Sequence, residues 1–425
     1  MQDIVYKFGD FVDKNVPKHP ALSRKMLIAG FCAFGLKLDH RPNPELPESR
    51  QYIASLLNDI VIDMLTHSDR AALTSVFMPC EMLQVMGIRS LCAELFSCFI
   101  NGAHAEKAFV EAAENEGIAE TYCSYHKVLL GSAYSGVMPK PAAIVNTSLI
   151  CDANNLTFRA LSDHYGIPQF YLDVPSESGE ESTRYVADQL RELKTFLEDQ
   201  TGKLFDEQKL KEQIACSGRT IENLIETQPY RRDRWLAGDI ASELYEVYVT
   251  HIGLGTKEAE TYTQLLKRDF QNAPKADGRG ARILWIHTIP NWQPPIRETF
   301  NLSEDAQIIG CDMNWDSLIP MDPEHPYESM ARRLTESTFN GNGERRIRAA
   351  VDMAEKLDAD GAIVFCHWGC KQTMGLSAVF KDALEDAGFP TLILNGDGCD
   401  ENNSSDGQIA TRLSAFLEML KERRD

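Results

Sequence analysis

Gly361-Ala-Ile-Val-Phe-Cys-His-Trp-Gly-Cys-Lys-Gln372 is the stretch that decides how this chain folds. Its first five residues, 361–365, form a short apolar run, which predicts a buried strand. Residues 377–384 predict a helix soon afterwards. A buried strand followed by a helix is the repeating unit of a parallel α/β sheet, and such sheets hold their functional groups at the carboxyl ends of the strands. Cys366 and Cys370 fall at that end, so we expect the chemistry of the chain there.

The same pattern occurs on both sides of a long helical stretch. Apolar runs predict strands at 73–78, 142–146 and 169–174, and again at 282–287, 306–309, 361–365 and 391–394. Helices are predicted at 105–116, 155–165, 185–197, 205–225 and 408–423. Alternation of strands and helices argues for βαβ units and parallel sheets. We therefore expect an α/β fold with two Rossmann- or flavodoxin-like parallel-sheet domains joined by a helical segment.

These patterns divide the chain into four parts. The predicted boundaries are a helical N-terminal region at 1–60, a first α/β domain at 61–177, a helical segment at 178–277 and a second α/β domain at 278–425. No short internal repeat relates the two α/β parts.

Charge and composition exclude several classes of function. The formal net charge of the 425 residues is −20, and no basic run interrupts that acidity, which argues against binding to nucleic acid or to an anionic membrane. There is no apolar stretch of about 18 residues, as a membrane span would need, and the first residues lack a signal-peptide pattern. We therefore expect a cytoplasmic protein whose cysteines are reduced.

Eleven cysteines are many for such a chain. Five of them are predicted to be structural, since a free cysteine fills a core well: Cys32, Cys92, Cys98, Cys216 and Cys311. The other six lie in predicted loops or at strand ends: Cys80, Cys123, Cys151, Cys366, Cys370 and Cys399. Cysteines that converge from distant loops of a reduced protein indicate a thiolate-bound metal centre rather than disulfides. A buried pair without any ligand is the alternative for Cys366 and Cys370.

The setting of individual cysteines sharpens this prediction. Cys123 and Cys151 each precede a predicted helix, and the backbone N–H groups of a helix start stabilise a thiolate. Cys366 and Cys370 are separated by three residues. Zinc ribbons and thioredoxin-type redox pairs need two intervening residues, so neither of these sites is expected.

Glu81 is a candidate for acid–base chemistry. It follows Pro79 after a predicted strand and opens a predicted helix, so we expect its carboxylate at the same sheet edge, where it would contact substrate or move a proton. The alternative is a first-turn glutamate that interacts with the helix dipole. His367 is a second candidate for such a role, because it lies within the cysteine motif. The chain has no phosphate-binding loop, dinucleotide fingerprint, zinc-peptidase motif or serine-hydrolase motif.

Seven short motifs occur in a fixed order from about residue 70 to the end of the chain. They are Pro79-Cys-Glu-Met-Leu83, Cys123-Ser-Tyr125, Cys151-Asp152, Asp173-Val-Pro175, His367-Trp-Gly-Cys-Lys-Gln372, Gly396-Asp-Gly-Cys-Asp400 and Asp406-Gly-Gln-Ile-Ala-Thr-Arg412. This ordered set resembles the 2-hydroxyacyl-CoA dehydratase family, which includes the dehydratase subunits, the benzoyl-CoA reductase subunits and the double-cubane cluster reductases.

The resemblance implies a cofactor, an activity and partners. A [4Fe-4S] cluster would be held by Cys123, Cys151 and Cys370. The chain would be the iron–sulfur subunit of an anaerobic lyase that removes water from an (R)-2-hydroxyacyl-CoA through a ketyl radical. A separate ATP-dependent iron–sulfur activator would deliver the electron, and a homologous second subunit would complete a heterodimer.

The chain departs from the family pattern at three cysteines. Cys80 stands where the pattern usually has an apolar residue, and Cys366 and Cys399 are additional. Six candidate ligands would suffice for a double cluster. We favour one cluster, because Cys366 and Cys399 lack the helix-start setting of the others, and Cys80 is the best candidate for a further ligand. A reductase of the benzoyl-CoA or double-cubane type is the alternative activity, and a non-catalytic metal-binding scaffold is a second alternative. The acyl group and the subunit that binds it stay open.

Overall fold

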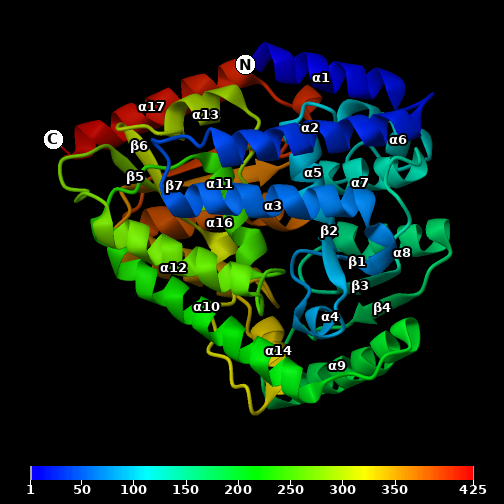
Figure 1. Cartoon of the computed structure of the whole chain (residues 1–425). Helices are drawn as coiled ribbons and strands as arrows, with labels where there is room; N and C mark the ends of the chain where they lie inside the picture. The colour runs from blue at the N-terminus through cyan, green and yellow to red at the C-terminus, as the bar shows by residue number, and fades with distance from the viewer. Residues whose placement is uncertain (1, 425) are drawn as a thin grey trace.

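The computed structural model describes residues 2–424 and contains two four-stranded parallel sheets surrounded by helices (Figure 1). The first sheet has the order β2-β1-β3-β4 and consists of β1 (Ala71–Thr74), β2 (Arg89–Cys92), β3 (Ala143–Thr147) and β4 (Gln169–Leu172). The second has the order β6-β5-β7-β8 and consists of β5 (Ala281–Ile286), β6 (Ala306–Cys311), β7 (Gly361–His367) and β8 (Thr391–Gly396). The predicted fold class is confirmed.

Both sheets have the flavodoxin-like strand order, and this order locates their ligand sites. In each sheet the second strand in sequence lies on one side of the first strand, and the third and fourth lie on the other side. The winding therefore reverses between β1 and β3, and again between β5 and β7. Ligands of open α/β sheets bind beyond the carboxyl ends of the strands at such a reversal.

Helices cover the sheets and connect them. The N-terminal helices are α1 (Gln2–Asn15), α2 (Pro20–His40) and α3 (Glu48–Thr66). Those of the first half are α4 (Glu81–Val85), α5 (Ala93–Gly102), α6 (Lys107–Asn115), α7 (Ser124–Tyr134) and α8 (Asp152–Tyr165). The middle helices are α9 (Glu180–Thr201), α10 (Glu207–Asp233), α11 (Ile240–Thr250) and α12 (Lys257–Asn272). The second half contains α13 (Pro294–Phe300), α14 (Pro326–Thr335), α15 (Gly343–Leu357), α16 (Lys371–Asp386) and α17 (Asp406–Arg424), and short 3-10 turns lie at Ser68–Arg70, Asp312–Asn314 and Glu401–Asn403.

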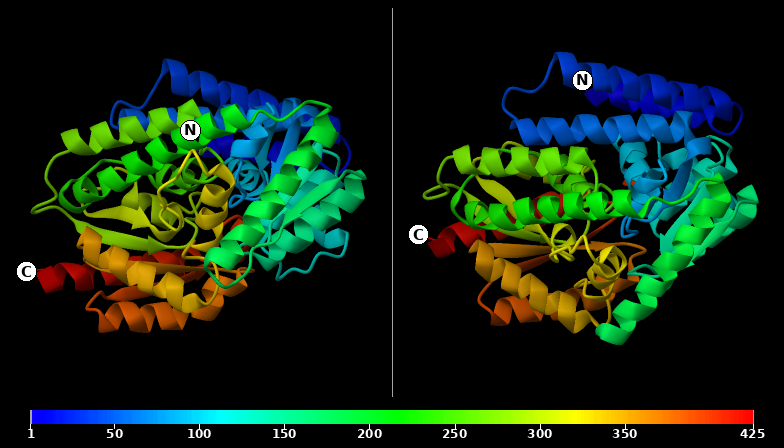
Figure 2. Two further views of the ribbon diagram at one scale, coloured as in Figure 1. Left: turned by 90° about the horizontal axis from the view of Figure 1, so that it is seen from below. Right: turned by 60° about the horizontal axis from the view of Figure 1, so that its bottom comes forward.

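The middle helices contact both halves of the molecule. Helix α9 packs against β4 of the first sheet and against α14 of the second half, while α10 contacts α4, β6 and α15. In both views of Figure 2 the N-terminal helices (blue) lie on the opposite side of the molecule from α16 (orange). The strands of the first sheet fall within 61–177 and those of the second within 278–425, but the domain boundaries themselves stay a prediction. Within residues 2–424, no helix has both the length and the apolar character to cross a bilayer.

The element boundaries differ from the predicted ones at strand ends. The strand predicted at 73–78 begins at Ala71 and ends at Thr74, so the following residues form a loop. Strand β2 was not predicted, because its four residues run directly into α5 and the two elements look like one apolar stretch. Arg89 at the start of β2 is exposed, as expected at the edge of a sheet.

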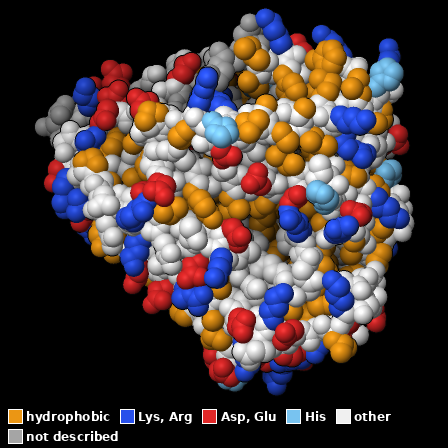
Figure 3. Space-filling model, viewed as in Figure 1, with side chains coloured by type: hydrophobic (Ala, Val, Ile, Leu, Met, Phe, Trp, Pro, Cys, Tyr) orange, Lys and Arg blue, Asp and Glu red, His pale blue; other side chains and the backbone are white. Residues whose placement is uncertain are grey.

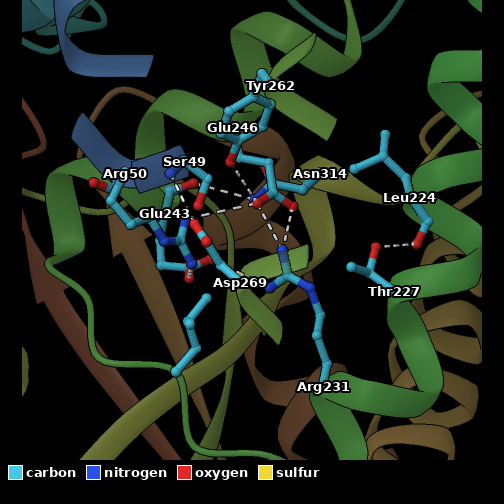
Figure 4. A network of polar contacts seen from close by, with 12 residues as sticks. Ser49, Arg50, Leu224, Thr227, Arg231, Glu243, Glu246, Tyr262, Asp269 and Asn314 are labelled. Atoms are coloured by element: carbon cyan, nitrogen blue, oxygen red, sulfur yellow. Dashed lines mark hydrogen bonds and ion pairs between the residues drawn. The ribbon is translucent and has the colours of Figure 1, made fainter. Parts of the chain in front are cut away.

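Helix α11 is buried along almost its whole length, although it carries two glutamates. Every residue from Ser242 to Thr250 is buried. Figure 4 shows how the charges are matched: Arg231 Nη2 donates to both carboxylate oxygens of Glu246 at 2.7 and 2.6 Å, and Arg50 pairs with Glu243. Removal of one partner of such a buried pair typically costs about 3–5 kcal/mol. This network therefore fixes α11 between the surrounding helices.

Candidate functional site

A cavity of about 630 Å³ lies beyond the carboxyl ends of both sheets. Its lining includes one residue or more from the loop after each of four strands: Val76 and Phe77 after β1, Ile150 and Cys151 after β3, His287 and Thr288 after β5, and Gly369 and Cys370 after β7. The winding of the first sheet reverses between β1 and β3, and that of the second reverses between β5 and β7. The cavity therefore occupies the position at which each sheet alone would bind a ligand, and its volume is in the usual range of about 300–1,000 Å³ for such sites.

Three of the predicted cysteines meet in this cavity. Cys123, Cys151 and Cys370 all belong to its lining, although they are far apart in the sequence. Each is the residue immediately before the first turn of a helix: α7, α8 and α16 respectively. The positive end of a helix dipole favours the thiolate form of such a cysteine. The structure thus contains the predicted convergence of the three cysteines at helix starts. Metal binding by these residues stays a prediction.

Hydrogen-bond donors contact two of the three sulfur atoms. Gly398 N–H donates to His367 Nδ1 at 3.0 Å, which assigns the ring proton to Nε2. His367 Nε2 therefore donates to Cys123 Sγ, at 3.2 Å. The backbone N–H of Asn154 donates to Cys151 Sγ at 3.4 Å. Bonds of this kind stabilise negative charge on sulfur and tune the reduction potential of a bound cluster.

The cysteines influence one another's ionisation. Burial, followed by repulsion from the thiolates of Cys151 and Cys370, raises the pKa of Cys123 well above its ordinary value. Burial likewise raises the pKa of Cys151 to about 12. Thiolates this close in one cavity need a cationic partner if they are to ionise together, and a metal centre provides one.

Gly369 brings the two halves of the site together. Its φ is +88°, and a Cβ atom at this position would lie 2.7 Å from Cys123 Cα. A side chain would therefore both strain the backbone and collide with the start of α7. Glycine at 369 allows the loop that carries Cys370 to pass directly against Cys123.

The donor set fits a polynuclear iron–sulfur cluster. Among residues 2–424, no group of three His, Cys, Asp or Glu side chains is arranged to hold a single metal ion. The three cysteines instead line one cavity, and in a cluster each thiolate binds a different iron atom. All three donors are soft sulfur atoms, which suit iron–sulfur centres.

The remaining predicted cysteines lie elsewhere. None of Cys80, Cys366 and Cys399 belongs to the lining of the cavity. Cys80 Sγ donates to Met78 O at 3.2 Å, Cys399 Sγ donates to Ser97 O at 3.4 Å, and Cys366 packs in the core of the second half.

Glu81 also lies outside the cavity lining. It opens α4 as expected, but its fully buried carboxylate accepts from Arg333 at 2.8 and 3.2 Å and from Ser217 Oγ at 2.9 Å. The side chain is thus directed toward α10 and α14, and not toward the cysteines. A catalytic role for Glu81 stays a prediction. His367, in contrast, lines the cavity.

Glu94 is a half-buried carboxylate in the cavity lining that the sequence analysis missed. It is in the first turn of α5, and burial raises its pKa to about 7. Its Oε2 accepts from the backbone N–H of Val76 at 3.2 Å, and its Oε1 lies 4.0 Å from His126 Nε2. Burial lowers the pKa of His126 to about 3, so that ring is neutral. Recognition of β2 would have identified Glu94 as a residue that follows a strand.

Apolar side chains complete the wall of the cavity. Leu244, Val247 and Tyr248 come from α11, and Phe339 comes from the second half. The outer surface differs: on the face in Figure 3, basic, acidic and hydrophobic side chains are interspersed.

Comparison with known proteins agrees with this geometry. The family model described as 2-hydroxyglutaryl-CoA dehydratase, D-component, matches residues 75–420, a range that includes every residue lining the cavity. The lactoyl-CoA dehydratase subunit alpha of Anaerotignum propionicum is 24% identical over 382 residues, which cover 81% of this chain and 89% of that protein.

Two further relatives have similar coverage. The (R)-2-hydroxyisocaproyl-CoA dehydratase alpha subunit of Clostridioides difficile is 23% identical over 83% of this chain and 90% of its own length. The (R)-phenyllactyl-CoA dehydratase alpha subunit of Clostridium sporogenes is 19% identical over 82% of this chain and 88% of its own length. Since the family model spans most of the chain and its cavity, the chain belongs to the 2-hydroxyglutaryl-CoA dehydratase D-component family.

Proposed function

We propose that this chain is the iron–sulfur subunit of a 2-hydroxyacyl-CoA dehydratase, a lyase that removes water from an (R)-2-hydroxyacyl-CoA. The observation that carries the proposal is the convergence of Cys123, Cys151 and Cys370 with Glu94 in one cavity. The relatives are named as alpha subunits of dehydratases that act on such thioesters.

Cys123, Cys151 and Cys370 would hold a [4Fe-4S] cluster. Bound there, the cluster would supply one-electron chemistry, which makes the β-hydrogen of the acyl group acidic enough to remove. His367 would keep Cys123 in place and stabilise charge on its sulfur through the 3.2 Å hydrogen bond. The positions of Cys80, Cys366 and Cys399 outside the cavity lining support a single cluster over a double one, and thus a dehydratase over a double-cubane reductase.

Glu94 would move the proton. Dehydration needs a base for the β-proton and an acid for the departing hydroxyl, and a group whose pKa is about 7 serves both purposes near neutral pH. The backbone N–H of Val76 occupies Oε2, so Oε1 is the atom that would exchange the proton. A scaffold without turnover gives no reason for a half-buried carboxyl with this pKa in the same cavity as three cysteines.

The apolar wall from α11 would receive the acyl chain and exclude water. Leu244 and Val247 present hydrocarbon to the cavity, while the network of Arg231 and Glu246 holds the helix behind them. Exclusion of water strengthens each polar contact in the site.

Two partners complete the proposal. The relatives are called alpha subunits, which supports assembly with a homologous second subunit into a heterodimer. The chain has no nucleotide-binding motif, so a separate ATP-dependent iron–sulfur activator would deliver the low-potential electron.

Anaerobic purification and metal analysis test the cluster. Wild-type protein should be brown and contain iron, and Cys123→Ser, Cys151→Ser or Cys370→Ser should remove most of it. Cys366→Ser is the matched control, because this cysteine is buried but outside the cavity lining, and it should retain the iron. Iron that survives the triple substitution, or zinc in place of iron, would contradict the ligand assignment.

Turnover tests the activity. The loaded chain should be mixed with its second subunit and activator and offered lactoyl-, phenyllactyl- and 2-hydroxyisocaproyl-CoA. Formation of the 2-enoyl-CoA should require the activator and ATP. Multiple turnovers by this chain alone, with a mild reductant and no ATP, would contradict the proposal.

A further inference from the structure

Two residues in the cavity have a backbone conformation that side chains rarely adopt. Ile150 has φ +82° and His287 has φ +80°, and neither is glycine. Ile150 precedes Cys151 after β3, and His287 follows β5 directly. Such strain persists only where the surrounding structure enforces it, and it occurs most often at functional sites. Each sheet thus contributes one strained residue at its own winding reversal.

The conformation of His287 is enforced by the groups behind it. Its backbone N–H donates to Asp312 Oδ1 at 2.7 Å, and Asp312 Oδ2 accepts from Arg346 Nε at 2.8 Å. Cys311 Sγ donates to the carbonyl oxygen of His287 at 3.3 Å. Both backbone polar groups are therefore held by β6 and the turn after it, and this fixes His287 in the lining of the cavity.

The ring of His287 differs from that of its neighbour His367. The two ring centroids are 6.3 Å apart. His367 uses both nitrogens, one for Gly398 and one for Cys123. Both ring nitrogens of His287 are buried, and neither bonds to a group within residues 2–424. Burial also lowers the pKa of His287 to about 3, so the ring is neutral, with one N–H donor and one acceptor.

A buried donor without a partner costs free energy, and so does the strained backbone that places it. Packing does not require either cost, because a glycine would avoid both of them and an apolar residue would avoid the unpaired donor. A ligand that accepts a hydrogen bond from the ring would offset the free energy lost through the unpaired donor and the strained backbone. An acyl thioester has a carbonyl oxygen that can only accept, and electron addition to the acyl group increases the negative charge on that oxygen.

We propose that His287 is a substrate-binding residue that donates its ring N–H to the thioester carbonyl oxygen of the acyl-CoA. This inference rests on the proposed function and names a contact within that site. The bond would exist in the ground state and become stronger as negative charge develops on the oxygen. His287 would thus contribute both to affinity and to rate.

Three substitutions separate binding from folding. His287→Gly removes the ring and the backbone strain together, His287→Leu removes the nitrogens and keeps the strain, and His287→Asn keeps a donor in a residue that tolerates this conformation. His325→Asn is the control, because His325 is exposed and lies outside the cavity lining. All variants should retain the iron of the wild-type protein.

Calorimetry on the anaerobic, cluster-loaded heterodimer without activator measures binding in the absence of turnover. The probes are lactoyl-, phenyllactyl- and 2-hydroxyisocaproyl-CoA, and the probe that binds wild type most tightly is kept. We expect about tenfold weaker binding for His287→Gly and His287→Leu, a smaller loss for His287→Asn and no change for His325→Asn. The thermal midpoint of His287→Gly should equal or exceed that of wild type, because strain and an unpaired donor are removed.

A thioether analogue that lacks the carbonyl oxygen identifies the atom bound. Wild type should prefer the thioester about tenfold over the thioether, and His287→Gly should show little preference. The assignment of His287 would be overturned if His287→Gly lost equal affinity for the thioester and the thioether, or if its affinity for the thioester were unchanged. It would also be overturned if the thermal midpoint of His287→Gly fell enough to account for the lost affinity. Failure of all three acyl-CoA probes to bind wild type would overturn the proposed function, and this inference with it.

Discussion

The Nε2 proton of His367 points at the sulfur of Cys123, 3.2 Å away, because the other ring nitrogen is occupied by the backbone N–H of Gly398. The two residues come from different halves of the molecule: Cys123 immediately precedes α7 in the first half, and His367 ends β7 in the second. This hydrogen bond thus joins the halves of the molecule at the candidate cluster, beside those that Tyr125 makes with Thr288 and Gly398. This link supports a positioning role of His367 for the sulfur, while its acid–base role stays a prediction.

Substitution of His367 should change the potential of the cluster more than its occupancy. In His367→Leu the three cysteines remain, so most of the iron should be retained, but Cys123 loses its donor. Loss of a hydrogen bond to a cluster ligand destabilises the reduced, more negative form and lowers the reduction potential. A redox titration followed by electron paramagnetic resonance measures this shift. His367→Gln, which keeps a donor, should recover part of it, and an unchanged potential in His367→Leu would show that the bond is absent in the loaded protein.

Gly369→Ala should disturb the cluster site without any change of ligand. The new Cβ atom would lie 2.7 Å from Cys123 Cα, and alanine at a φ of +88° costs about 1–2 kcal/mol from the backbone alone. We expect a lower thermal midpoint and reduced iron content. Gly407→Ala is the control: no atom lies within 4 Å of its added Cβ, and the substitution lies in the first turn of α17, where it should change stability by less than about 1 kcal/mol. Normal iron content in Gly369→Ala would show that this loop can move without loss of the site.

Local sequence patterns were sufficient to predict where the cysteines lie, but they did not predict that Glu94 lines the cavity. Apolar runs such as 361–365 identify buried strands, and parallel strands present their carboxyl ends at one edge, so the convergence of Cys151 and Cys370 follows from local patterns. The orientation of a side chain after a strand depends on packing. Glu81 and Glu94 both open helices, yet only Glu94 lines the cavity. Arg333 pairs with the Glu81 carboxylate and holds it outside the cavity lining. It lies 252 residues further along the chain, so no sequence pattern near Glu81 indicates this contact.

The left-handed conformation of His287 was equally invisible in the sequence. It depends on Asp312 and Arg346, which come from later elements of the second half. Strain that is imposed by tertiary contacts leaves no mark in local composition, and histidine at a strand end resembles any half-buried polar residue.

Glu94→Gln should retain the cluster and lose turnover by about 10²–10⁴-fold, the usual contribution of a positioned acid or base. The rate of wild type should depend on a group with a pKa of about 7, and this dependence should be absent from the residual activity of the variant. Rates across pH 5.5–8.5 in the reconstituted system provide the measurement. A variant that retains full activity would remove Glu94 from the mechanism.

The same residue should affect stability in a pH-dependent way. The pKa of Glu94 is raised in the folded chain from an ordinary 4.5 to about 7, so its contribution to stability is fully present below pH about 4.5 and is lost as the pH rises through 7. The difference of roughly 2.5 units corresponds to about 3 kcal/mol. Glu94→Gln should therefore gain stability relative to wild type between pH 5 and pH 8, as measured by urea unfolding of the metal-free chains. A pH-independent difference would contradict the raised pKa.

The helical wall of the cavity provides a test of the buried charge network. Glu246→Gln leaves Arg231 with a buried, partly unmatched charge, which should cost about 3–5 kcal/mol of unfolding free energy. Because Val247 and Tyr248 line the cavity on the same helix, the affinity for acyl-CoA should fall with stability. Glu226→Gln is the control: it breaks an exposed pair with Lys267, and pairs of that kind are worth about 0–1 kcal/mol. Equal stability of the two variants would show that the network does not fix α11.

Substitutions at Glu81 can distinguish a structural role of this residue from a catalytic one. Its carboxylate is fully buried and paired with Arg333, so Glu81→Gln should lower the free energy of unfolding by about 3–5 kcal/mol. Replacement of both partners, as in Glu81→Leu with Arg333→Met, should restore most of that stability, because a matched apolar pair leaves no buried charge unpaired. If the pair is only structural, turnover per cluster should recover in the double variant along with the thermal midpoint. If Glu81 contacts substrate or moves a proton, stability should recover while the rate stays low. Unfolding curves and iron-normalised rates on the same preparations separate the two outcomes, and a rate that recovers with stability would contradict the catalytic assignment of Glu81.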